Sequence, residues 1–267
     1  MTRILYQDSL EITNSKSIVS FDTKGGGQWE VWYRYISIEG KPAYEIGDIC
    51  GTCSFYFERL GGANQSVHHS DLIEQLNEGL SSLDKKTTKK VAEIIPNGKY
   101  KVLFLKVFPR KIELGTETDY FANEGIKLWG VDGFWGMPHN PKIKYYRGTD
   151  QIIKEDEKIF EFIIPIFPQT WLEPKRIDFY KRQLEQGKIP TAISLSILDV
   201  KAPAVWYNEQ KPEITGHWCL AHYILDGHHK IFAATEINKP IYLICFLATE
   251  EGIYETEKDV ETLLSNI

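Results

Sequence analysis

Five consecutive residues, Asp226-Gly227-His228-His229-Lys230, stand where an apolar strand pattern ends and a short helical pattern begins. A glycine at such a turn lets a backbone N–H approach a ligand closely. The start of the following helix offers unpaired N–H groups and the positive end of its dipole, and Lys230 adds a full positive charge. The turn therefore predicts an anion site, with Asp226 able to hold a metal. In the alternative interpretation, Asp226 caps the helix and both histidines are polar turn residues.

The sequence on both sides of this turn resembles a known family. The stretch YILDGHHKIFAATEINKPIYLICFL resembles the DGHHR signature of the ParB/sulfiredoxin-like superfamily. The preceding FYKRQLEQGKIPTAISLSILD is similar to the helix, turn and first strand of that family. The resemblance covers about residues 158–250 and leaves residues 1–157 uncovered. It implies a nucleotide-phosphate site formed by Gly227, His228, His229 and Lys230.

The match departs from the family at two positions. Lys230 stands where the family usually has arginine, which keeps a cation but loses the bidentate fork. His228 stands where sulfiredoxin has its nucleophilic cysteine, so sulfinic-acid repair is not expected. The sequence shows no DNA-binding helix-turn-helix and no strongly basic segment, which argues against a segregation protein. The fold by itself does not choose among the remaining activities of the family.

From this resemblance we expect a nucleotide-dependent phosphotransferase that acts on a small acceptor, with ATP or a related nucleotide and Mg²⁺ as cofactors. Phosphoryl transfer depends mostly on positioning and charge neutralisation. Asp226 and His228 are the expected catalytic residues, and Asp226 is also a possible metal ligand with Asp199 and Glu213 as possible partners. Two alternatives stay open. One is a non-catalytic nucleotide-sensing or protein-binding module whose aromatic N-terminal part meets a protein partner, and the other is a metal-dependent nuclease.

A second group of reactive residues is the Cys50-Gly51-Thr52-Cys53 segment, which follows a strand-like run. A helix is possible after it, ending at Gly61-Gly62, and a thiol at a helix N-terminus has a lowered pKa. The spacing also suits two zinc ligands, although a structural zinc site needs two more. The pair is therefore interpreted as buried structural thiols, as a possible redox pair, or as metal ligands.

A metal site is not expected at His217, Cys219 and His222. In a strand, successive side chains point to opposite faces, so His217 and Cys219 share one face and His222 lies on the other.

The chain has 267 residues and a formal net charge of −6, with 42% hydrophobic and 25% charged residues. This composition is ordinary for a soluble globular protein, and nucleic acid is not an expected partner because no strongly basic face is present. The KKTTKK segment at 85–90 is interpreted as a solvated helix face or turn. No apolar run suits a signal peptide or a membrane span, so we expect a cytoplasmic protein without membrane contact.

The pattern along the chain predicts an α+β fold with a β-rich N-terminal part, residues 1–157, of unknown role. Strands are expected within 3–49 and at 100–108, a helix at 69–83 with Ser70 as its N-cap, and a glycine- and aromatic-rich loop at 128–141. Residues 158–267 are expected to form an α/β region that resembles the ParB/sulfiredoxin-like superfamily and ends in an acidic tail. No linker separates the two regions, so one continuous core is the alternative.

Overall fold

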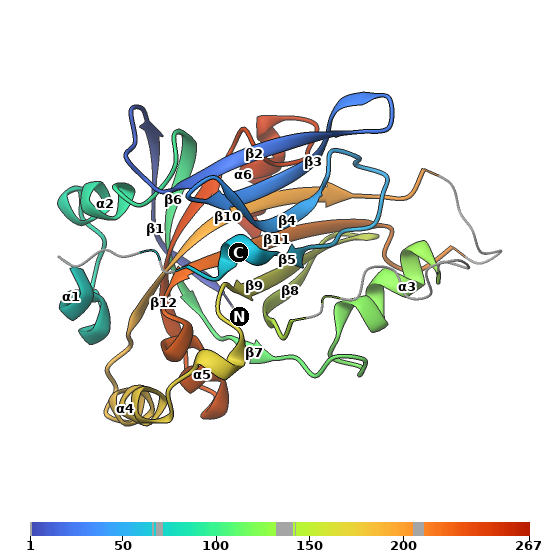
Figure 1. Ribbon diagram of the computed structural model, residues 1–267. Helices are drawn as coiled ribbons and strands as arrows, with labels where there is room; N and C mark the ends of the chain where they lie inside the picture. The colour runs from blue at the N-terminus through green and yellow to red at the C-terminus, as the bar shows by residue number, and fades with distance from the viewer. Residues whose placement is uncertain (1, 66, 68–71, 132–140, 142, 205–210) are drawn as a thin grey trace.

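The computed structural model describes residues 2–65, 67, 72–131, 141, 143–204 and 211–267. The fold is mixed α+β, as expected (Figure 1). Within the described residues the strands form one sheet of eight and one sheet of four. The smaller sheet packs on one face of the larger sheet, and three helices pack on the opposite face.

The larger sheet has the following strands in spatial order: β1 (Arg3–Ile12), β6 (Gly98–Val107), β12 (Ile241–Ala248), β10 (Thr191–Lys201), β11 (Gly216–Asp226), β9 (Glu157–Pro165), β8 (Tyr146–Lys154) and β7 (Arg110–Lys111). The smaller sheet has the order β2 (Val19–Gly26), β3 (Trp29–Ile38), β4 (Lys41–Asp48) and β5 (Glu58–Arg59). The α-helices are α1 (Ile73–Glu78), α2 (Lys85–Ala92), α3 (Glu124–Trp129), α4 (Pro174–Glu185), α5 (His228–Glu236) and α6 (Glu257–Asn266), and short 3-10 turns include Gly61–Ala63, Tyr120–Ala122 and Gln169–Trp171.

Strand β11 shows how the two layers are built. Cys219 and Tyr223 belong to the core shared with the smaller sheet, whereas Leu220 and Ile224 belong to the core shared with α4, α5 and α6. Successive side chains of a strand point to opposite faces of the sheet, and a hydrophobic core covers each face. The sequences of the central strands are therefore nearly continuous apolar runs. Strand β11 is parallel to β9 and antiparallel to β10, and β10 is parallel to β12.

Strands from both halves of the chain share the larger sheet. Strands β1, β6, β7 and β8 precede residue 157 and pair with or extend the strands that follow it. The predicted division at residue 157 lies inside the antiparallel pair of β8 and β9. The two regions therefore build one sheet with a common core on each face.

The helix and the strand expected within FYKRQLEQGKIPTAISLSILD are present as α4 and β10. Helix α4 begins at Pro174, as expected for a residue without an N–H group, and the chain turns away at Gly187, whose φ is 83°. The KKTTKK segment, interpreted as a solvated helix face or turn, lies in helix α2, which begins at Lys85 with Asp84 as its N-cap.

Three local expectations need correction or lie outside the described residues. The helix predicted at 69–83 is shorter, because α1 ends at Gly79 with a φ of 90°, and its predicted cap Ser70 is outside the described residues. No α-helix follows the cysteine pair; residues 54–57 have no regular secondary structure and lead into β5. Of the predicted loop at 128–141, residues 132–140 are outside the described residues. No helix in the described part of the chain is long and apolar enough to cross a membrane.

Candidate functional site

The predicted anion turn lies between β11 and α5. Gly227 has a φ of 107°, in the left-handed region, and a Cβ placed on it would lie 2.5 Å from the Cβ of Ala192. Only glycine fits both the backbone conformation and this contact. Helix α5 begins at His228, as the sequence predicts.

Both histidines of the turn are buried and accept hydrogen bonds from the chain. The Nε2 atom of His228 accepts from the backbone N–H of Ile166 at 3.0 Å, and Nε2 of His229 accepts from the N–H of Glu173 at 3.0 Å. The ring of Phe167 stacks on His228 with centroids 4.2 Å apart. Burial lowers the pKa of His228 to about 3 and also lowers the pKa of His229. The two rings therefore tie α5 to the connection between β9 and α4.

The side chain of Lys230, the cation of the turn, also forms hydrogen bonds within the protein. Lys230 is 3% exposed, and its Nζ donates to the carbonyl of Thr191 at 2.9 Å and to the carboxylate of Asp226 at 3.0 Å. Burial lowers the pKa of Lys230, against the opposing influence of Asp226. An anion that binds at this turn must compete with Asp226 for Lys230.

The possible metal partners of Asp226 lie elsewhere. Asp199 is paired with Cys219 in the β10–β11 register, seven residues before Asp226 along β11, and it binds Arg34 instead. Glu213 is exposed and precedes β11. The expectation that these two acids join Asp226 is therefore wrong, because the strand separates its two ends by about 3.3 Å per residue.

The cysteine pair lies in the loop that follows β4. A carboxylate oxygen of Asp48 and the sulfur atoms of Cys50 and Cys53 all lie within 4.8 Å of one another. The Oδ1 atom of Asp48 accepts a hydrogen bond from the backbone N–H of Cys50 at 3.0 Å, which folds the loop back on its own start. Both cysteines are half-buried and reduced. The loop thus gathers two thiols and one carboxylate at a partly accessible position.

A buried set of charges lies beneath this loop. Lys201 is 1% exposed, and its Nζ donates to the carbonyl of Cys50 at 2.6 Å and lies 3.9 Å from Oδ1 of Asp48. The guanidinium of Arg34 binds both oxygens of Asp199, at 3.1 and 2.6 Å. Two cations and two carboxylates therefore balance, so no charge of this buried set is left uncompensated.

The two thiols have different proton affinities. Burial by itself would raise the pKa of Cys50, but hydrogen bonds with Cys53 and Thr52 outweigh it and lower the pKa. Burial and the hydrogen bond with Cys50 raise the pKa of Cys53 to about 12. The hydroxyl of Thr52 lies 3.2 Å from the Cys50 sulfur. The predicted cause, a helix dipole, is replaced by these local donors, since no helix follows the pair.

An aromatic group borders the loop on the side of α3. The indole N–H of Trp129 donates to the carbonyl of Thr52 at 3.4 Å, and its ring meets His217 edge-on at 5.2 Å. The hydroxyl of Tyr120 lies 2.7 Å from Nδ1 of His217. Burial lowers the pKa of His217 to about 3, so the ring in this contact is neutral. As predicted, His217 and Cys219 share one face of β11 and His222 lies on the other.

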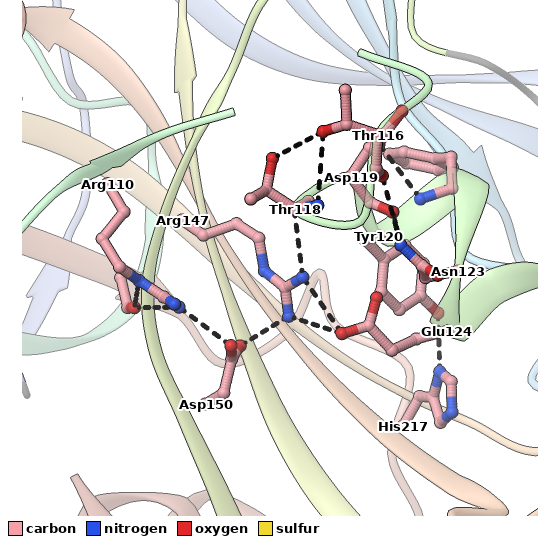
Figure 2. A network of polar contacts seen from close by, with 12 residues as sticks. Arg110, Thr116, Thr118, Asp119, Tyr120, Asn123, Glu124, Arg147, Asp150 and His217 are labelled. Carbon is pink, nitrogen blue, oxygen red and sulfur yellow. Dashed lines mark hydrogen bonds and ion pairs between the residues drawn. The ribbon is translucent and has the colours of Figure 1, made fainter. Parts of the chain in front are cut away.

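Figure 2 shows the polar network that holds α3 in this position. The guanidinium of Arg147 is 4% exposed and binds Oε1 of Glu124 through both of its terminal nitrogens at 3.1 Å. Its Nη2 also donates to Asp150 at 2.7 Å, and Arg110 binds the other oxygen of Asp150 at 2.8 Å. Because Glu124 begins α3 and Trp129 ends it, this network fixes the aromatic border of the cysteine loop.

A third polar group is sealed inside the sheet. The Nδ1 atom of His222 lies 2.8 Å from the hydroxyl of Ser196 and its Nε2 atom lies 3.2 Å from Glu161, and all three side chains are fully buried. Burial would lower the pKa of His222, but Cys245 and Glu161 outweigh it and raise the pKa to about 9. Because Ser196 is fully buried and out of reach of a substrate, this group does not form a serine-hydrolase active site.

Sequence reasoning found Cys50 and Cys53 but missed Asp48, Lys201 and Trp129. Asp48 carries a local signal, since it stands two residues before Cys50 in DICGTC. Lys201 and Trp129 carry none, because they reach the loop from other parts of the chain. Comparison of the chain with protein-family models, curated proteins and solved structures found no match.

Proposed function

We propose that this protein carries out thiol–disulfide exchange through Cys50 and Cys53. One observation carries the proposal: two half-buried sulfurs lie within 4.8 Å of each other, and the pKa of one thiol is lowered while that of its partner is raised. Exchange needs an attacking thiolate, accessibility and a resolving thiol within reach. The Cys50–Cys53 loop has all three.

The reaction transfers two electrons from the dithiol to a substrate disulfide. The Cys50 thiolate attacks one substrate sulfur, which forms a mixed disulfide and releases the other substrate sulfur as a thiolate. Cys53 then loses its proton and attacks the Cys50 sulfur. This second step forms the Cys50–Cys53 disulfide and releases the second substrate thiolate. A small dithiol reductant, the co-reactant of this proposal, returns the protein to the reduced state by the reverse exchange.

The residues around the loop serve this chemistry in distinct ways. Thr52 donates to the Cys50 sulfur and stabilises the thiolate. Lys201 holds the Cys50 carbonyl and supplies a nearby positive charge that lowers the cost of a thiolate on Cys53. Trp129 fixes the carbonyl of Thr52 between the two cysteines. The loop is therefore held at both its middle and its base.

The test is a redox titration of the pair, done in the presence of a metal chelator. The protein is equilibrated at a series of dithiol/disulfide ratios and quenched with a thiol-alkylating reagent. Its mass is then measured by mass spectrometry to count the alkylated thiols. We expect a single two-electron transition in the wild type that is absent from Cys50→Ser and from Cys53→Ser. Cys53→Ser should also accumulate a mixed disulfide with oxidised glutathione. Cys219→Ala is the matched control, because its thiol is fully buried.

Two results would refute exchange at this site. The first is independent alkylation of Cys50 and Cys53 at every ratio, with no intramolecular disulfide formed. The second is a two-electron transition that persists in the Cys50→Ser variant, which would place the couple on other cysteines.

The second candidate is the nucleotide-dependent phosphotransferase, with ATP and Mg²⁺, that the family resemblance implies. It is favoured by the left-handed Gly227 ahead of the nine-residue helix α5 and by the adjacent Lys230. Phosphate would bind at the start of α5 if Lys230 exchanged Asp226 for a phosphate oxygen. His228 and His229 would contribute by holding the turn against the segment 166–173.

A thermal-shift panel of nucleotides with and without Mg²⁺ tests this candidate. A ligand at about a hundred times its dissociation constant stabilises a fold by about 2.7 kcal/mol. For a protein of this size that corresponds to on the order of 2–4 °C for each kcal/mol. A shift that is lost in Lys230→Met would support the site, with Lys181→Met, on the neighbouring helix, as the control cation. A shift without ATP turnover would favour the non-catalytic sensing module, and no shift with any nucleotide would remove both.

A further inference from the structure

We infer that Asp48, Cys50 and Cys53 form a binding site for a thiophilic divalent cation, for which Zn²⁺ is the probe. The inference uses the same loop as thiol–disulfide exchange but goes beyond it, because metal binding does not require the exchange activity. It stands on the positions of the three ligand atoms, on the charges behind them and on their access to solvent.

The three ligand atoms are already close to the spacing of a tetrahedral centre. They lie within 4.8 Å of one another. Zinc binds thiolate sulfur at about 2.3 Å, so two sulfurs on one tetrahedral ion lie about 3.8 Å apart. The loop therefore needs only a small contraction around the ion. The hydrogen bond from the Cys50 N–H to Asp48 holds the carboxylate on the same side as the thiols before any ion binds.

The charges around the loop suit the bound state. A divalent cation with two thiolates and one carboxylate carries a net charge of −1. The Nζ of Lys201 lies 3.9 Å from Asp48 and compensates that charge, while Arg34 and Asp199 cancel each other. The occupied site is neutral as a whole, which avoids the large cost of an unpaired charge near the core. Before an ion binds, the charge of Lys201 balances the carboxylate of Asp48.

The coordination has an open position. Among the described residues, the group that can hold a metal ion in this way consists of these three side chains. Three protein ligands with a fourth position for water or substrate are typical of catalytic rather than structural zinc. Both cysteines are half-buried, so solvent reaches the fourth position. An ion bound by both thiolates also prevents disulfide formation, so the metal and the oxidised form exclude each other.

The experiment uses the full chain, reduced and freed of metal. Zn²⁺ is titrated by calorimetry against a competing chelator, and Co²⁺ is added in parallel because its thiolate charge-transfer absorption reports the number of sulfur ligands. We expect one ion per chain with two thiolate ligands, and loss of binding in Cys50→Ser and Cys53→Ser. Asp48→Asn should weaken the affinity by at least about tenfold, in line with losses at metal-supporting residues. Asparagine keeps the acceptor for the Cys50 N–H, so the loop is preserved.

The controls separate this inference from other outcomes. Asp22→Asn, at an exposed carboxylate, should leave the affinity unchanged. Absence of binding, or an Asp48→Asn variant with unchanged affinity, would overturn the three-ligand site. Binding that survives either cysteine substitution would also overturn it. The redox titration is done with chelator, so a protein that binds Zn²⁺ without a two-electron transition refutes exchange alone, and the reverse result refutes the metal site alone.

Discussion

Replacing Glu161 with glutamine removes the carboxylate that faces His222 in the sealed polar group of the sheet. Burial alone would lower the pKa of His222, yet Cys245 and Glu161 raise it to about 9. In the unfolded chain the histidine returns to about 6.5. The ring is therefore protonated in the folded protein over a range in which it is neutral in the unfolded chain.

The sign and size of the effect follow from this difference. A pKa that is raised by folding gives a stabilisation that is fully present below pH 6.5 and is lost as the pH rises through 9. Each pKa unit corresponds to about 1.4 kcal/mol, so His222 contributes about 3 kcal/mol at most to the free energy of unfolding. In Glu161→Gln one of the two groups that raise the pKa of His222 is gone while Cys245 remains, so the pKa falls and part of this contribution disappears.

Urea unfolding at several pH values between 6 and 9.5 measures the contribution. Between pH 6.5 and 9 the wild type should lose more stability than Glu161→Gln loses, by up to about 3 kcal/mol. Ser196→Ala is the matched control, because it removes a hydrogen-bond partner of His222 but no charge. It should be less stable by about 1 kcal/mol at each pH and keep most of the pH dependence. Parallel profiles of wild type and Glu161→Gln over this range would refute the reasoning.

Three further predictions test the fold. Gly227→Ala should cost well over 1 kcal/mol in a thermal unfolding experiment because it combines a left-handed backbone with a clash, whereas Gly187→Ala, left-handed but in open space, should cost about 1 kcal/mol. Arg34→Met should destabilise by about 3–5 kcal/mol in urea, because it leaves Asp199 buried without its bidentate partner; a loss below 1 kcal/mol would contradict this. Asp84→Ala should cost about 1 kcal/mol by removing the N-cap of α2, and unchanged stability would show that the cap is dispensable.

The sequence predicted the elements of the second half of the chain well. Pro174 and Gly187 mark the start and end region of α4, and the alternating pattern of TAISLSIL follows β10. These signals are local: they depend on backbone preferences and on residue spacing of 2 or 3.6. The helix predicted at 69–83 was too long because apolar spacing alone did not show that the chain turns at Gly79, where a Cβ would meet the backbone of Ile189.

Only some residues of the cysteine site could be predicted from the sequence. The CxxC spacing identified both thiols, and the neighbouring Asp48 could have been added from DICGTC. The environment of the thiols could not be predicted, because the expected helix dipole is absent and Lys201 lies 151 residues from Cys50. The DGHHK turn shows the converse: its position between strand and helix was predicted, whereas its internal bonding was not.

What the sequence alone determined is therefore most of the strands and helices between residues 158 and 248, the glycine at the β11–α5 turn and the identity of the reactive side chains. The tertiary structure decided which of those side chains already form hydrogen bonds or ion pairs within the protein. Lys230 and both histidines form hydrogen bonds with the backbone, and Lys230 also pairs with Asp226. Lys201 and Arg34 lie beneath the cysteine loop. The physical reason is the separation along the chain of the residues that set each property. Backbone conformation depends on neighbouring residues, but the charge, burial and hydrogen bonding of a side chain depend on strands that meet only when the sheets assemble.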